Sequence, residues 1–138
     1  MFEIIINQSV GPFMLGQHIE NYITNYHFEF TAKQSEHEDW DCYSYGEGVI
    51  SIYTKQGIIE SIACRTDCYL SNYFLIDADM DDFLSTFKID KQALQKDTVF
   101  VYDDISQDVY EVDELGMQIW VDNDNKIVTV FVSPQDPE

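Results

Sequence analysis

The amino-acid sequence predicts an α+β fold of two tandem helix-plus-antiparallel-hairpin repeats, in which the helices pack on one face of an antiparallel sheet. Three observations lead to this fold class. A short apolar segment followed by an amphipathic helical pattern begins at residue 11 and again at residue 72. A strand–turn–strand pattern follows each copy. The 138 residues are 45 % hydrophobic and 14 % aromatic, which suits a single packed domain.

The repeat is clearest between segments 11–23 and 72–84. Aligned without a gap, the matching pairs are Phe13 with Phe74, Leu15 with Ile76, Ile19 with Met80, Tyr22 with Phe83 and Ile23 with Leu84. The two hairpins also align, because residues 50–53 match 117–120 and residues 59–62 match 127–130. The single domain, 1–138, therefore divides into pseudo-repeats at about 1–69 and 70–133, and 134–138 forms a tail.

In the first unit, the helix is expected at residues 17–25. Its apolar residues recur at the spacing of one helical face: Ile19, Tyr22, Ile23 and Tyr26. Short β-branched or alternating runs predict strands on both sides of it. These strands are expected at 2–6, 27–30, 42–45, 49–54 and 58–64. The last two form a hairpin whose tight turn contains Gly57.

In the second unit, the helix is expected at residues 79–87, again from apolar residues on one face: Met80, Phe83, Leu84 and Phe87. Asp77 or Asp79 can cap this helix, and the two acidic residues that follow suit the positive end of its dipole. Residues 89–95 predict a further helical turn. The expected strands lie at 98–102, 108–112, 117–121 and 127–132, and the last two form the second hairpin.

The charge of the chain is strongly acidic. Its 26 Asp and Glu residues outnumber 7 Lys and Arg residues, which gives a net charge of −19. No basic residue falls between Lys96 and Lys126. Such a surface repels nucleic-acid phosphates and anionic membranes and attracts cationic proteins. We therefore expect a protein partner, no nucleic-acid partner and no membrane partner.

The expected compartment is the cytoplasm. The first residues, Met1 to Ile6, lack the basic n-region of a signal peptide. No apolar run reaches the roughly 20 residues that span a membrane. The chain has three cysteines, Cys42, Cys64 and Cys68. Because an odd number cannot all pair within one chain, we expect reduced thiols.

No catalytic or metal-binding pattern emerges from the sequence. The histidines, His18, His27 and His37, lie in no nucleophile context. Residues 37–42 contain ligand types without a recognisable ligand spacing. Residues 77–82 open like a calcium loop, but the sixth position is Asp82 and the twelfth is Lys88, where that loop needs Gly and Glu. We expect no enzyme, no cofactor and no metal site.

The candidate functional residues belong instead to a partner interface, because Tyr and Trp anchor protein interfaces and carboxylates attract a basic partner. The predicted interface comprises Glu38, Asp39, Trp40, Asp41, Tyr43, Tyr102, Asp103, Asp104, Asp108, Tyr110, Glu111, Asp113 and Glu114. The competing interpretation is that the aromatic residues fill the core. Tyr53 and Trp120 match in the repeat and are expected to share one structural role, in the core or on a sheet face.

Three motifs resemble those of small bacterial immunity proteins that protect cells from polymorphic or contact-dependent toxins. They are Gly11-Pro12-Phe13-x-Leu15-Gly16-x-x-Ile19-x-x-Tyr22, Leu115-Gly116-Met117-x-Ile119-Trp120-Val121-Asp122 and Lys126-Ile127-Val128. The duplicated plan is also similar to that of β-lactamase inhibitor protein. The resemblance implies a non-enzymatic, stoichiometric inhibitor that binds a cognate toxin domain in the cytoplasm.

Many toxins of this kind are nucleases with basic clefts, which an acidic inhibitor can occupy. The sequence therefore favours a basic nuclease domain as the partner. The alternative is an acidic nucleic-acid mimic or adaptor that binds a cationic host protein. Gene order separates the two hypotheses, because an immunity gene is expected directly downstream of its toxin gene.

Overall fold

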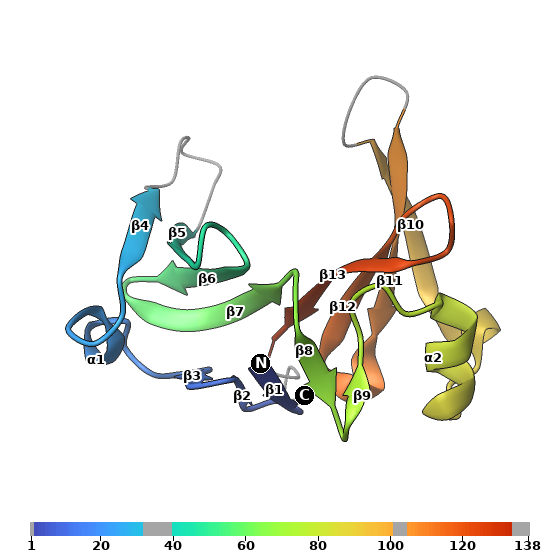
Figure 1. Ribbon diagram of the computed structural model, residues 1–138, viewed down its shortest axis with the longest axis horizontal. Coiled ribbons are helices and arrows are strands. Elements are labelled where there is room, and N and C mark those ends of the chain that lie inside the picture. Colours follow the sequence, from blue (N-terminus) through green and yellow to red (C-terminus); the bar gives the residue numbers. More distant parts are fainter. Residues whose placement is uncertain (1, 32–39, 101–104, 134–138) are drawn as a thin grey trace.

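The structure, a computed structural model, describes residues 2–31, 40–100 and 105–133 and is mostly β. Strands and bridges account for 52 % of it and helical residues for 14 %. The predicted α+β class of helix-plus-hairpin repeats is therefore wrong. The two α-helices, α1 (Glu20–Ile23) and α2 (Met80–Thr86), contain 4 and 7 residues and lie at opposite ends of the molecule (Figure 1). A second, smaller sheet lies below the centre of the main sheet, with one helix toward each end (Figure 1).

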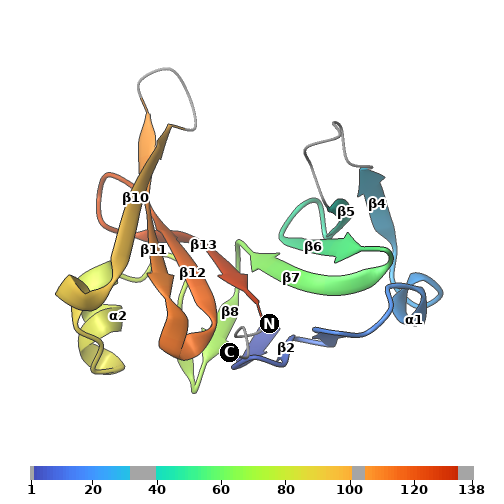
Figure 2. The same ribbon diagram turned by 180° about the vertical axis from the view of Figure 1, so that it is seen from behind.

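The larger sheet has eight antiparallel strands in the order β10-β11-β12-β13-β7-β6-β5-β4. Its strands in the first half of the chain are β4 (Phe28–Thr31), β5 (Asp41–Tyr45), β6 (Ile50–Lys55) and β7 (Ile58–Cys64). Those in the second half are β10 (Gln95–Phe100), β11 (Ser106–Val112), β12 (Met117–Val121) and β13 (Ile127–Val132). Hairpins β4–β5 and β10–β11 rise as two arms at the two ends of the sheet (Figure 2).

The smaller sheet has five short strands in the order β3-β2-β1-β8-β9. They are β1 (Phe2–Ile5), β2 (Ser9–Val10), β3 (Phe13–Met14), β8 (Cys68–Leu70) and β9 (Tyr73–Phe74). Strand β1 pairs with β8 in parallel and with β2 antiparallel. The N-terminal strand thus joins the two units of the chain at the centre of this sheet.

The first helix is short because the residues before it pair with a strand. The N–H of Gly16 donates to Ile59 O at 2.8 Å, and the N–H of Ile19 donates to Gly57 O at 2.8 Å. These bonds hold the backbone against β7, so the helix begins only at Glu20, and no side chain caps it. The apolar spacing that predicts a helix over 17–25 therefore yields about one turn.

The second helix is longer because Asp79 caps it, as predicted. Its carboxylate accepts hydrogen bonds from the backbone N–H groups of Asp81 and Asp82 at 2.9 and 3.2 Å. Two 3-10 turns complete the helical content, Lys91–Ala93 and Asp113–Leu115. The second turn ends at Gly116, where φ is a left-handed 60°. A Cβ at this position would also lie only 2.7 Å from the backbone O of Ser133, so the site suits glycine alone.

The Asp79 cap predicts a pH-dependent contribution to stability. The N–H groups of Asp82 and Asp81 hold the pKa of Asp79 below its ordinary value of 3.8. A pKa that is lower in the folded state means that the charged carboxylate stabilises the protein above the unfolded pKa, and that this contribution disappears as the pH falls through the folded pKa. In denaturant titrations, Asp79→Ala is expected to be less stable than the native chain at pH 7, with a difference that shrinks below about pH 4. A difference that stays constant down to about pH 2.5 would contradict this assignment.

The two halves of the large sheet meet symmetrically at β7 and β13. Their register pairs Ile62 with Val132, Ala63 with Phe131 and Cys64 with Val130. Since Ala63 and Phe131 are equivalent in the hairpin alignment, a pseudo-twofold axis passes through this pair. Loop hydrogen bonds repeat across the axis as well. The bond from Gly16 N to Ile59 O has its counterpart in the bond from Asp77 N to Ile127 O, and both measure 2.8 Å.

The structure corrects the alignment of the apolar segments by one residue. In the small sheet, Ser9 pairs with Met14 just as Tyr69 pairs with Phe74. Met14 therefore corresponds to Phe74, and the two side chains are 46 % and 52 % exposed. Phe13, which the ungapped alignment matches with Phe74, is fully buried. Successive residues of a strand point to opposite faces, so a shift of the alignment by one residue exchanges buried and exposed positions. The corrected alignment therefore changes which side chains are expected in the core.

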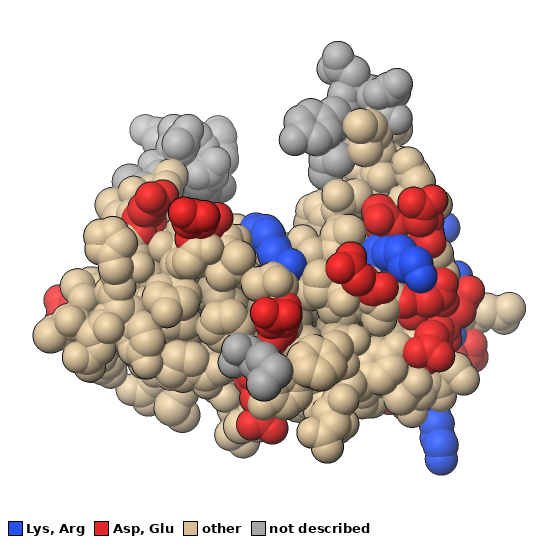
Figure 3. All heavy atoms as spheres, viewed as in Figure 1, with Lys and Arg blue, Asp and Glu red and all other residues tan. Residues whose placement is uncertain are grey.

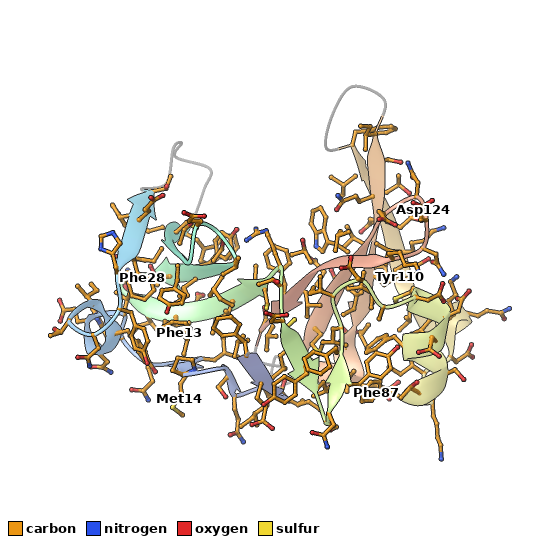
Figure 4. The ribbon with its side chains drawn as sticks, in the orientation of Figure 1. Phe13, Met14, Phe28, Phe87, Tyr110 and Asp124 are labelled. Carbon is orange, nitrogen blue, oxygen red and sulfur yellow. The ribbon has the colours of Figure 1, made fainter. Side chains whose placement is uncertain are left out.

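The core lies between the two sheets. In the first unit it is aromatic, with the ring of Phe13 5.1–5.8 Å from the rings of Tyr22, Tyr26, Phe28 and Tyr45. In the second unit, the buried face of α2 supplies Met80, Phe83 and Leu84. Figure 4 shows Phe13 and Phe28 at one end of the molecule, and Phe87 and Tyr110 at the other.

Candidate interaction surface

The face of the larger sheet that points away from the core is hollowed between the two arms (Figure 3). One row of directly paired residues crosses this face, with one residue from each strand. From β4 to β10 the row reads Glu29, Ser44, Ser51, Ala63, Phe131, Gln118, Glu111 and Gln95. We call this row, together with the flanking residues Tyr53, Glu60, Arg65 and Trp120, the concave face.

Three aromatic side chains occupy the centre of the concave face. The ring of Phe131 lies 5.9 Å from the ring of Tyr53 and 5.9 Å from the ring of Trp120. Tyr53 and Trp120 are equivalent across the pseudo-twofold axis, so they flank Phe131 from the two halves of the sheet. All three are half-buried, whereas their neighbours Ile52, Ile119 and Val130 are fully buried on the core side. The shared role expected for Tyr53 and Trp120 is therefore on the sheet face.

A chain of hydrogen bonds orients the Trp120 indole. Its Nε1–H donates to Gln118 Oε1 at 2.7 Å, and Gln118 Nε2 donates to Glu111 Oε1 at 2.6 Å. The Glu111 carboxylate is half-buried. The arrangement holds the aromatic ring in one orientation and leaves a negative charge beside it, which favours contact with a cationic group over the ring.

A second carboxylate reaches this face through a β-bulge. In β7 the pairing passes from Ser61 to Ile59, so Glu60 and Ser61 together oppose Tyr53. A bulge of this kind re-aims a side chain. In the described chain, the half-buried Glu60 places its Oε2 where it has no hydrogen-bond partner. An unpaired buried carboxylate oxygen is unfavourable in the free protein.

The concave face is not symmetric in its side chains. On the β7 side of the axis the central row holds the small residues Ser44, Ser51 and Ala63, whereas the equivalent positions hold Glu111, Gln118 and Phe131. The face is therefore lower over β5 and β6 and higher over β12 and β13. A partner that docks across it meets a different shape on each side of the axis, which gives the surface one preferred binding direction.

The structure places only some of the predicted interface residues on this face. Glu111 lies on it, and Glu38, Asp39, Tyr102, Asp103 and Asp104 fall outside the described residues. Trp40 is 47 % exposed and precedes Asp41 at the start of β5. Asp113 and Glu114 are exposed on the 3-10 turn after β11. Asp108 is paired with the buried Val121, so it points to the opposite side from Glu111.

Two of the three tyrosines in the predicted interface, Tyr43 and Tyr110, lie on the core side of the larger sheet. Tyr110 is 5 % exposed in the core, beneath the Nζ of Lys91 at 5.8 Å from its ring centre. Tyr43 is half-buried on the core side, with its ring 4.9 Å from that of Phe30. Burial raises the pKa of the Tyr43 phenol, and the nearby charges of Asp41 and Glu20 add to the effect. Strand alternation sends both side chains inward, because they pair with the buried residues Ile119 and Ile52.

Sequence reasoning missed Phe131, Gln118 and Arg65. A local signal for Phe131 is present in the sequence, because it alternates with Val130 and Val132 and therefore points away from the face that these valines bury. Gln118 alternates in the same way with Met117 and Ile119. No local signal identifies Arg65, whose position depends on how β7 packs against β6 and β13.

The described residues contain no group of three or more His, Cys, Asp and Glu side chains placed to hold a metal ion. None of the helices in the described ranges is long and apolar enough to cross a membrane.

Cys64 and Cys68 are both fully buried in the core, where the Cys68 thiol lowers the pKa of Cys64 by hydrogen bonding to it.

No protein-family model, curated protein or solved structure matches this chain.

Proposed function

We propose that this chain is a bacterial immunity protein that acts in the cytoplasm, where it binds a cognate toxin domain in a one-to-one complex and inhibits it without catalysing a reaction. The observation that carries the proposal is the concave face, where Tyr53, Phe131 and Trp120 stand half-exposed between the carboxylates of Glu60 and Glu111. Aromatic anchors ringed by charged groups are typical of protein-binding surfaces.

The charge of the chain favours a basic partner. A net charge of −19 on 138 residues accelerates association with a positively charged protein and slows association with nucleic acid. The cleft of a toxin nuclease is basic because it binds phosphates. An inhibitor with carboxylates beside exposed aromatic rings can fill such a cleft, so a nuclease toxin domain is the partner class that we propose.

The decisive experiment expresses the toxin domain encoded directly upstream, with and without this chain. Co-expression is expected to restore growth, and the two purified proteins are expected to co-elute in a one-to-one complex. If the toxin kills equally well when this chain is present, the proposal is rejected. Capture of a host DNA-binding protein without protection from the toxin would instead favour the nucleic-acid-mimic hypothesis.

A matched pair of charge reversals on strand β11 tests whether the concave face is the contact surface. Glu111 and Asp108 lie on the same strand but on opposite faces of the sheet. Both Glu111→Lys and Asp108→Lys change the net charge by the same amount, so both slow long-range association similarly. Only Glu111→Lys is expected to raise the dissociation rate as well, by about tenfold or more, because it places a cation against a basic partner. Surface plasmon resonance at two salt concentrations separates these rates, and equal dissociation rates for the two variants would exclude this face.

A further inference from the structure

The only arginine of the sequence, Arg65, lies on the concave face. It follows Cys64 at the end of β7, and Cys64 pairs with Val130 of β13. Its Nη1 donates to Gly48 O at 3.0 Å and to Ser51 Oγ at 2.7 Å. Ser51 belongs to the central row, so the guanidinium group rests over the low half of the face.

These two hydrogen bonds fix the guanidinium but leave it without a counter-charge. The ion pairs of the described chain join His18 with Glu20 and Lys91 with Asp81, and neither includes Arg65. The Nη2 and Nε donors make no hydrogen bond within the described chain. In a protein of net charge −19, an arginine fixed by neutral acceptors and unpaired with any described carboxylate retains its capacity to bind an anion.

We propose that Arg65 binds a carboxylate side chain of the protein that docks on the concave face. This inference rests on the proposed function and adds to it the chemistry of the partner surface. The toxin surface would present cations toward Glu60 and Glu111 and one acidic residue toward the low half of the face. The remaining guanidinium donors match the two oxygens of a carboxylate. A partner that lacks the acidic residue would leave Arg65 desolvated and unpaired, so this contact provides specificity.

The direction in which one substitution changes the affinity for the toxin distinguishes this inference from general electrostatic attraction. Arg65→Met removes a positive charge, which makes the chain more attractive to a basic toxin at long range. If charge steering were the only effect, Arg65→Met would bind as tightly as the native chain or more tightly. Loss of a carboxylate contact predicts the opposite, a weakening of affinity by about tenfold or more. Lys55→Met is the matched control, because Lys55 is exposed at the far end of β6 and its loss changes the net charge equally.

The binding test uses calorimetry with the toxin domain and full-length variants whose melting temperatures show that they are folded. The expected result is weaker binding for Arg65→Met, partial recovery for Arg65→Lys and no weakening for Lys55→Met. A carboxylate-to-amide scan of the toxin should then identify one variant whose loss of affinity is not additive with Arg65→Met. If Arg65→Met binds as tightly as the native chain does, the inference is overturned while the proposed function stands.

A second measurement needs no toxin. Because the chain has one arginine, its Nε–H group gives a single resonance in ¹H–¹⁵N spectra. Sodium acetate is expected to shift this resonance saturably, beyond the shift caused by equal ionic strength of sodium chloride. The shift should weaken in Ser51→Ala, which frees Nη1. Identical responses to acetate and chloride would overturn the inference, and a saturable acetate shift without any toxin binding would uphold the anion site while rejecting the proposed function.

Discussion

Replacing Phe13 by alanine is expected to lower the free energy of unfolding by about 3–5 kcal/mol, the largest stability effect that we predict. Phe13 is fully buried, and its ring contacts four other aromatic rings at 5.1–5.8 Å. The alanine would leave a cavity between the two sheets that rigid aromatic neighbours cannot close. Urea unfolding followed by near-ultraviolet circular dichroism measures the change.

The neighbouring residue supplies the control. Met14 follows Phe13 in β3 but points outward and is 46 % exposed. Met14→Ala is expected to change stability by less than about 1 kcal/mol, because little apolar surface leaves the core. Similar losses for the two variants would contradict the register of the small sheet, since that register alone decides which of the two side chains is buried.

Replacing Trp120 by alanine is expected to weaken binding of the proposed toxin by about 100-fold or more, the size of effect found at central aromatic residues of interfaces. The substitution removes the indole that packs against Phe131 and leaves Gln118 Oε1 without its Nε1–H donor, whereas Gln118 Nε2 can still donate to Glu111. Isothermal titration calorimetry measures the loss of affinity, and the melting temperature of the free variant reports any loss of folding.

The control for Trp120 is Phe100, an aromatic residue that is 70 % exposed on the edge strand β10. Phe100→Ala removes exposed aromatic surface outside the concave face and is expected to leave the affinity within about threefold of the native value. The chain has two tryptophans, so a Trp40→Phe background makes Trp120 the sole indole reporter. Its fluorescence is expected to change on complex formation, and an unchanged spectrum at saturation would remove Trp120 from the contact surface.

The sequence by itself determined most local structure. Strands β7, β12 and β13 begin and end at the predicted residues, because alternation and turn residues act over a few positions. The cap of α2 is equally local, since Asp79 bonds to N–H groups two and three residues away. The shared role of Tyr53 and Trp120 follows from the same short-range pattern, repeated in two hairpins.

Only the tertiary structure decided the fold class and the surface. The helix predicted at 17–25 lost residues to pairing with β7, a partner about forty positions away in the chain. Tyrosine is a residue type that is common in interfaces, but the pairing of Tyr110 with Ile119 places its side chain on the core side. Arg65 meets Ser51 and the concave face through the packing of three strands. Local patterns determine where strands form, whereas long-range register determines which of their faces becomes core and which remains free to bind.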